Sequence, residues 1–286
     1  HIVTKVGIQT NEIMCIIVIN GKELPHELTL ANDIIDKFPM VKTVVKNINT
    51  KNTNVIMGQK NEAIVGRGYI TDVLGDYIFK ISPMSFYQVN PIQAEALYNI
   101  AIEKANITKD DVVCDLYCGI GTIGIFASKF AKKVYGIEIH EILARICKIN
   151  LLLHHDGHTN IEGDRSCLET EFSKPRLNDF RDAFDIVVGN LPFGDTIIEG
   201  DEDQLGNNSL ENFVLSKGKD KIASEHIMIE RAIEFLAPGG KFAIVLPDGI
   251  FNNQGENSNC PLVRRYLVKN GFIKAVVSLP DHAFRK

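Results

Sequence analysis

A glycine-rich turn followed by a distant carboxylate is the first feature of this sequence that points to chemistry. Gly119-Ile-Gly121-Thr-Ile-Gly124 follows an apolar run, and Glu138 lies 19 residues beyond Gly119 at the end of the next one. Glycines at this spacing let a backbone approach a nucleotide closely where a helix begins. A carboxylate in the second position can accept hydrogen bonds from both hydroxyls of a ribose. The pattern therefore predicts a nucleotide-type cofactor, and by itself it also fits a dinucleotide-dependent dehydrogenase.

Two further acidic residues resemble those of methyltransferases and favour a methyltransferase cofactor over a dinucleotide. Asp115 ends the first apolar run, where S-adenosylmethionine-dependent methyltransferases keep an acid that orders the loop or meets the methionine amino group, and where dehydrogenases usually keep an apolar residue or glycine. Asp164 follows the third strand, where the same methyltransferases bind the adenine amine. The resemblance implies S-adenosyl-L-methionine as the cofactor. The residues assigned to it are Gln88, Asp115, Tyr117, Gly119, Gly121, Glu138, Asp164 and Asn190.

The segment Asn190-Leu-Pro-Phe193 is the candidate catalytic element, because it resembles the Asn-Pro-Pro-Phe/Tyr motif of amino-methyltransferases. An adenine amine is a poor nucleophile, since its lone pair is delocalised into the ring. Asn190 Oδ1 and the carbonyl of Leu191 could accept its two N–H groups, and Phe193 could stack on the extruded base. Leu191 stands where the DNA enzymes have the first proline, a substitution also found in the similar motif of ribosomal-RNA adenine dimethylases. A plain strand-exit turn is the alternative interpretation.

The front of the chain resembles ribosomal-RNA uracil-C5 methyltransferases over residues 1–141. The residues that carry this resemblance are Ile81-Ser-Pro-Met-Ser-Phe-Tyr-Gln-Val-Asn-Pro91, the turn at residues 115–124, Asn47-Ile-Asn and Asn52-Thr-Asn. In that family the Phe-x-Gln segment lines the cleft, which implies that Phe86 binds substrate and Gln88 binds cofactor. Uracil-C5 transfer also needs a cysteine nucleophile. The family's Ser-Cys-Asn-Pro segment is absent after the fifth strand, where this chain has Leu246-Pro-Asp-Gly249.

The back of the chain resembles the modification subunits of type I restriction systems, which methylate adenine N6 in DNA, over residues 143–286. Its carriers are Asn150-Leu-Leu-Leu-His, Gly189-Asn-Leu-Pro-Phe-Gly194, the stretch at residues 230–249 and Val277-Ser-Leu-Pro280. We therefore interpret the chain as a composite joined near residue 142. The leading hypothesis is transfer to adenine N6, and the alternatives are uracil-C5 transfer in ribosomal RNA and an inactive fragment that only binds nucleic acid or a partner.

The elements that must position these residues are predicted from hydrophobic periodicity. Residues 1–82 read as a small α+β accessory module, and residues 83–286 as a doubly wound, Rossmann-like α/β domain that is C-terminally truncated. The chain itself reads as a fragment at both ends. The main predicted helices are Pro91–Asn106, Glu141–Leu153 and His226–Leu236. The predicted strands of the large sheet are Val112–Tyr117, Val134–Ile139, Asn160–Glu162, Ile186–Gly189, Phe242–Leu246 and Ile273–Ser278.

Composition limits the partners only weakly. The 286 residues carry a formal net charge of −5, so a nucleic-acid surface must be local, and a strip of five lysines between Lys37 and Lys60 is one candidate, with a solvated sheet face as its alternative. Six cysteines without a CxxC pair predict reduced thiols in a cytoplasmic protein. We expect DNA or RNA and a specificity subunit as partners, and neither a membrane nor a metal. The polar insertion at residues 194–224 reads as a solvated loop or a gate over the target base.

Overall fold

The structure is a computed structural model that describes residues 1–51, 56–85, 87, 90–154, 160–255, 258–271 and 273–279. The chain divides into two compact units, one over residues 1–95 and one that begins at Ala96. The division falls inside helix α2 (Pro91–Ala105). A module boundary at residue 82 stays a prediction. No helix among the described residues is long and apolar enough to cross a bilayer.

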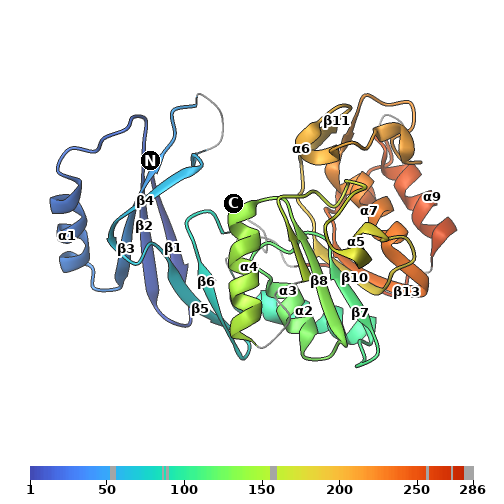
Figure 1. The fold of residues 1–286 in the computed structure, drawn as a ribbon, viewed down its shortest axis with the longest axis horizontal. Coiled ribbons are helices and arrows are strands. Elements are labelled where there is room, and N and C mark those ends of the chain that lie inside the picture. Colours follow the sequence, from blue (N-terminus) through green and yellow to red (C-terminus); the bar gives the residue numbers. More distant parts are fainter. Residues whose placement is uncertain are drawn as a thin grey trace. The chain divides into compact units, whose positions relative to one another are not determined.

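The first unit is built on a four-stranded sheet in the order β1-β2-β3-β4, with α1 against β3 and β4 (Figure 1). Strands β2 and β3 are parallel because α1 connects them, and the other pairs are antiparallel. A hairpin of β5 and β6 completes the unit, and the Asp72 carboxylate ties it to the β1–β2 turn through the N–H groups of Ile8 and Gln9. The elements are β1 (Ile2–Gly7), β2 (Glu12–Ile19), α1 (Glu27–Lys37), β3 (Val41–Ile48), β4 (Lys60–Gly66), β5 (Ile70–Leu74) and β6 (Tyr77–Ile81).

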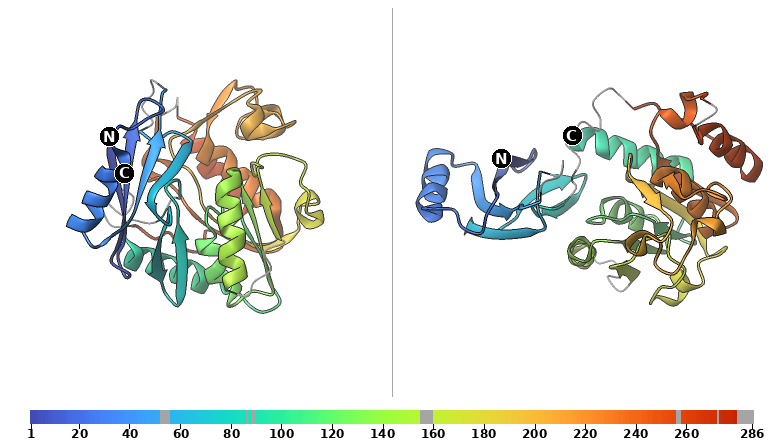
Figure 2. Two further views of the ribbon diagram at one scale, coloured as in Figure 1. Left: turned by 60° about the vertical axis from the view of Figure 1, so that its left-hand side comes forward. Right: turned by 90° about the horizontal axis from the view of Figure 1, so that it is seen from above.

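The second unit is a parallel five-stranded sheet in the order β13-β10-β7-β8-β9. Helices α3 and α4 pack on one face, and α7 packs on the other against β10 and β13 (Figures 1 and 2). The strands are β7 (Val112–Asp115), β8 (Lys133–Glu138), β9 (Ile161–Gly163), β10 (Phe184–Asn190) and β13 (Leu236–Val245). The helices are α3 (Thr122–Ser128), α4 (Glu141–Leu153), α5 (Pro175–Asn178), α6 (Glu202–Leu205), α7 (Ser224–Phe235), α8 (Gly249–Asn252) and α9 (Cys260–Asn270), with a short hairpin of β11 (Thr196–Ile198) and β12 (Lys221–Ala223).

Strand order places a topological switch between β7 and β10. The chain moves outward from β7 through β8 to β9 in one direction, and from β10 to β13 in the other. The loops that leave β7 and β10 therefore diverge, and the carboxyl ends of two such strands are where ligands bind in doubly wound sheets. The predicted Rossmann-like fold class is confirmed.

Several predicted elements are wrong or shifted. Residues 273–279 form no strand, and Ile273, Val276 and Val277 are 55%, 63% and 45% exposed, since none of the described strands pairs with them. The strand that follows α7 starts at Leu236 rather than Phe242, so β13 includes the segment Ala237-Pro-Gly-Gly240. The sequence of residues 54–57 is also β-rich, but residues 56 and 57 form no strand, and residues 54 and 55 lie outside the described part of the chain.

Candidate functional site

The glycine turn joins β7 to α3 in the conformation that only glycine adopts easily. Gly119 and Gly121 have φ angles of +55° and +91°. A Cβ atom on Gly121 would lie 2.8 Å from Cys147 Sγ in α4, whereas a Cβ on Gly119 would meet nothing within 4 Å. Gly121 is therefore required by packing inside the protein. Gly119 borders open space, where a ligand can approach the backbone.

Two polar contacts hold this turn from neighbouring elements. Gly119 N–H donates to Glu138 Oε2 at the end of β8, over 2.8 Å. The Asn150 side chain in α4 is wholly buried and its amide donates to the carbonyl of Ile120, also over 2.8 Å. Sequence reasoning missed Asn150, although Asn is unusual on the buried face of an apolar helix and could have indicated such a contact.

Glu138 combines a structural contact with a buried charge. Its second oxygen accepts from His140 N–H over 2.8 Å, so both oxygens bind backbone amides. Burial raises the pKa of this carboxyl, while the two amides oppose the shift. The Glu138 side chain is fully buried, and a carboxylate has about four acceptor positions, so its two backbone hydrogen bonds leave part of its acceptor capacity unused.

Asp115 is the buried acid of the site. Neither carboxyl oxygen meets a donor in hydrogen-bonding geometry among the described residues, and the side chain is 1% exposed. Burial raises its pKa to about 7, the nearby amides of Tyr117 and Gly124 lower it in part, and the charge of Glu138 raises it further. Burial likewise raises the pKa of Tyr117, which packs against the core. An unpaired buried acid beside an open glycine is what a site for a cationic ligand offers.

The candidate catalytic segment leaves β10 beside this acid. Val188 pairs with Asp115 across the β10–β7 ladder, and Asn190 pairs with Val245 of β13 two residues later. Asn190 is half-buried, the Leu191 side chain is buried, and Phe193 is half-buried against the core. The Pro192 carbonyl accepts a hydrogen bond from Ser224 Oγ over 3.1 Å. Sequence reasoning missed Ser224, whose only signal was its position before a helix.

Of the remaining predicted site residues, the structure describes Asp164 but not Phe86 or Gln88. Asp164 directly follows β9, is exposed and has a φ of +61°, so it lies at the same edge of the sheet as Glu138. Phe86 and Gln88 lie outside the described residues. Parallel strands end at the same edge, and the sheet therefore brings Asp115, Glu138, Asp164 and Asn190 to that edge.

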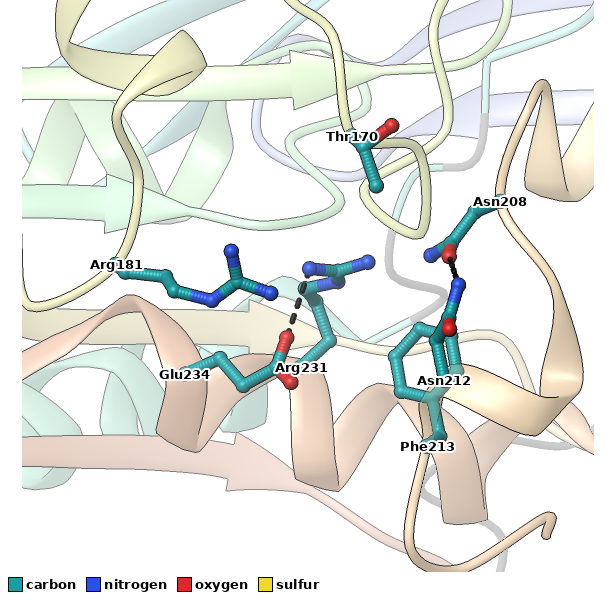
Figure 3. A pocket seen from close by; sticks show the side chains of 7 residues that line it. All are labelled: Thr170, Arg181, Asn208, Asn212, Phe213, Arg231 and Glu234. Atoms are coloured by element: carbon teal, nitrogen blue, oxygen red, sulfur yellow. Dashed lines mark hydrogen bonds and ion pairs between the residues drawn. The ribbon is translucent and has the colours of Figure 1, made fainter.

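A polar recess of about 280 Å³ lies elsewhere in the second unit and is lined by Thr170, Arg181, Asn208, Asn212, Phe213, Arg231 and Glu234 (Figure 3). Arg231 is 1% exposed and lies between two aromatic rings. It donates to Glu234 over 2.8 Å and to the Leu168 carbonyl over 2.7 Å. These contacts give Arg231 a structural role that joins α7 to the segment after β9.

The expectation of a strip of lysines in the first unit also changes. Lys46 lies between Glu27 and Glu62, 2.8 Å and 3.0 Å from their carboxylates, and Lys60 also pairs with Glu62. These two lysines are committed to ion pairs, so the lysine strip in the first unit is not a row of free cations. Among the described residues no group of three or more His, Cys, Asp or Glu side chains could hold a metal ion.

The sequence of this chain is similar to those of known methyltransferases. Residues 93–286, more than half of the chain, match the family described as N-6 DNA Methylase. An uncharacterized RNA methyltransferase of Oceanobacillus iheyensis is 44% identical over 162 residues, which are 57% of this chain and 35% of that protein. An uncharacterized RNA methyltransferase of Halalkalibacterium halodurans is 50% identical over 162 residues, which are again 57% of this chain and 35% of that protein. The chain thus spans about a third of the length of these curated relatives.

Solved structures share the fold. The Pyrococcus abyssi tRNA (uracil-54, C5)-methyltransferase in complex with S-adenosyl-L-homocysteine has a TM-score of 0.51 and 24% identity, and the match covers 67% of this chain and 42% of that one. P. horikoshii TYW2 in complex with MeSAdo has a TM-score of 0.50 and 14% identity, with 91% and 79% covered. At these identities the likeness concerns the α/β fold alone.

Proposed function

The chain belongs to the N-6 DNA methylase family, and from that premise we propose that it is an S-adenosylmethionine-dependent methyltransferase acting on adenine N6 of a nucleic acid. The observation that carries the proposal is the position of Asn190-Leu-Pro-Phe193 at the end of β10, one strand from the buried Asp115. The two lie on either side of the topological switch point.

The residues at the sheet edge fit the proposed cofactor. The unpaired Asp115 carboxyl suits a cationic sulfonium or ammonium group, and Glu138 suits a ribose diol. Gly119 borders open space, and Asp164, which follows the strand next to β8, is exposed. When bound, S-adenosylmethionine supplies an electrophilic methyl group on sulfur. Gln88, Tyr117 and Gly121 remain proposed members of the same site.

The chain's own contribution is to hold the amine. Asn190 Oδ1 and the Leu191 carbonyl accept the two N–H groups, which draws the nitrogen lone pair out of conjugation with the ring and aims it at the methyl carbon. The half-buried Phe193 is the side chain proposed to stack on the base. Formation of the N–C bond would be matched by loss of the carbon–sulfur bond, whose electron pair would leave on the sulfur of the demethylated cofactor. The surplus amine proton would stay hydrogen-bonded to Asn190 Oδ1 or the Leu191 carbonyl until water accepts it. No covalent enzyme intermediate is required.

Uracil-C5 transfer is the second candidate, because the named relatives are RNA methyltransferases. That reaction needs a thiolate to add to the base. All six cysteines are buried, and burial raises the pKa of Cys114 and Cys167. Cys260 lies 3.7 Å from His226 Nε2, but it too is buried. An inert nucleic-acid-binding fragment is the third candidate.

Label transfer from S-adenosylmethionine to DNA and RNA oligonucleotides tests the proposal. We expect label on adenine in the wild type and a loss of at least about a hundredfold in Asn190→Ala, because one of two oriented acceptors is removed. Asn212→Ala, which removes an exposed asparagine of the insertion, should retain activity. Label on adenine that persists in Asn190→Ala would sink the proposed role of the segment.

A further inference from the structure

The insertion after the candidate catalytic segment closes on itself. Thr196 at the start of β11 pairs with Ala223 at the end of β12, so the two ends of the insertion meet. Ser224 N–H donates to the carbonyl of Asp195 over 3.0 Å directly beyond this pair. The first turn of α7 is therefore joined to the residues that follow Phe193.

The interior of the insertion is packed rather than solvated. Its buried apolar side chains belong to the core under the sheet: Ile197, Leu205, Leu210, Phe213, Leu215 and Ile222. Glu230 of α7 accepts from the amides of Val214 and Leu215 over 2.6 Å and 2.8 Å. Removing that much apolar surface from water fixes the insertion against α7. The expectation of a solvated loop is wrong for these residues. Polar residues separate the buried apolar ones along the sequence, so the insertion has no apolar run that would predict burial.

Ser224 transmits this fixed position to the catalytic segment. Its side chain is 1% exposed, and its hydroxyl lies 3.1 Å from the Pro192 carbonyl. Glu225 Oε2 is a second acceptor at 3.3 Å, so the single hydroxyl proton has the carbonyl as its nearer partner. A held Pro192 carbonyl fixes the peptide plane between Pro192 and Phe193. Along the chain, that peptide lies between the Leu191 carbonyl and the Phe193 side chain.

We propose that Ser224 is a positioning residue for amino-methyl transfer, which holds the Asn190-Leu-Pro-Phe193 segment in its reactive geometry through the Pro192 carbonyl. The inference rests on the proposed function. A single hydrogen bond contributes about 1 kcal/mol to stability, but a displacement of about 1 Å in a reacting group can cost up to about a hundredfold in rate. Loss of the hydroxyl should therefore affect turnover more than folding.

Ser224→Ala is compared with Ser216→Ala, a matched control. Ser216 is also buried, and its hydroxyl donates to the Leu210 carbonyl over 2.6 Å inside the insertion, so both variants lose one serine-to-carbonyl hydrogen bond. We expect kcat to fall about tenfold in Ser224→Ala, with the KM for S-adenosylmethionine unchanged and Tm lowered equally in both variants. An equal kcat in the two variants overturns the inference.

Amide hydrogen exchange over residues 190–195 tests the contact independently of activity. Exchange should be faster in Ser224→Ala than in the wild type and unchanged in Ser216→Ala, because only the first variant releases the Pro192 carbonyl. Equal exchange in all three proteins overturns the positioning role, whether or not the wild type transfers methyl groups. If Ser224→Ala exchanges faster than the wild type but the wild type transfers no methyl group, only the proposed function is contradicted.

Discussion

Cofactor affinity should depend on pH through Asp115. Burial raises the pKa of this carboxyl to about 7, so near neutrality the ligand-free protein is a mixture of protonated and ionised forms. A sulfonium or ammonium group bound beside the glycine turn favours the ionised form. Binding below pH 7 must therefore release a proton from Asp115, and affinity should fall as the pH is lowered.

The magnitude follows from the ionised fraction. With a pKa of about 7, roughly a tenth of Asp115 is ionised at pH 6 and roughly nine tenths at pH 8, which corresponds to about a tenfold difference in affinity, or about 1.4 kcal/mol. Burial also raises the pKa of Glu138, which acts in the same direction. Asp115→Asn isolates the first contribution, because the amide cannot ionise.

Titration calorimetry with S-adenosylhomocysteine at pH 6 and pH 8, in two buffers of different ionisation enthalpy, measures both the affinity and the protons released. We expect about tenfold weaker binding by the wild type at pH 6, with close to one proton released there, and a much smaller dependence in Asp115→Asn. Equal wild-type affinities at the two pH values would refute the reasoning, as would an unchanged tenfold dependence in Asp115→Asn.

Three predictions concern stability. Asp115→Asn should raise the free energy of unfolding of the ligand-free protein at pH 8 by up to about 4 kcal/mol. Because burial raises the pKa of Asp115 from 3.8 to about 7, the wild type loses stability as the pH rises between these two values. Urea unfolding at pH 4 and pH 8 measures the difference. Gly121→Ala should cost about 2 to 4 kcal/mol through its positive φ and its clash with Cys147 Sγ, as a shift in urea midpoint. Arg231→Met should lower the free energy of unfolding by about 3 to 5 kcal/mol, because Glu234 loses its buried partner. A lower Tm would show this loss.

Matched variants control the last two. Gly119→Ala adds a methyl group at a positive φ but into open space, so it should cost only about 1 kcal/mol. Arg176→Ala removes an exposed arginine whose guanidinium carbon lies 5.8 Å from the centre of the Phe184 ring, and its effect should stay below about 1 kcal/mol. Equal losses within either pair would contradict the packing argument.

Local pattern was sufficient for the elements whose stability is mainly local. Glu141–Leu153 forms α4 with the predicted bounds, because its apolar residues recur at helical spacing. The βα alternation after Pro91 predicted the sheet, and the end of each strand then placed Asp115, Glu138 and Asn190 at one edge. The fold class and the common edge could thus be read from spacing alone.

Features that depend on distant partners could not be predicted. Residues 273–279 have the composition of a strand, yet strand formation needs a neighbouring edge that composition does not reveal. Lys46 reads as a surface cation until α1 and β4 bring two glutamates to it. The contact between Ser224 and Pro192 spans 32 residues, and only the closure of the β11–β12 hairpin creates it.

The methylated nucleoside itself tests the central claim most directly. The protein is incubated with S-adenosylmethionine and mixed-sequence DNA and RNA, the nucleic acid is digested to nucleosides, and the products are identified by mass spectrometry. Amine transfer at Asn190-Leu-Pro-Phe193 predicts N6-methyladenosine or its deoxy form, absent from the Asn190→Ala reaction. Formation of 5-methyluridine, or of no methylated nucleoside by a protein that binds S-adenosylhomocysteine, would contradict the account.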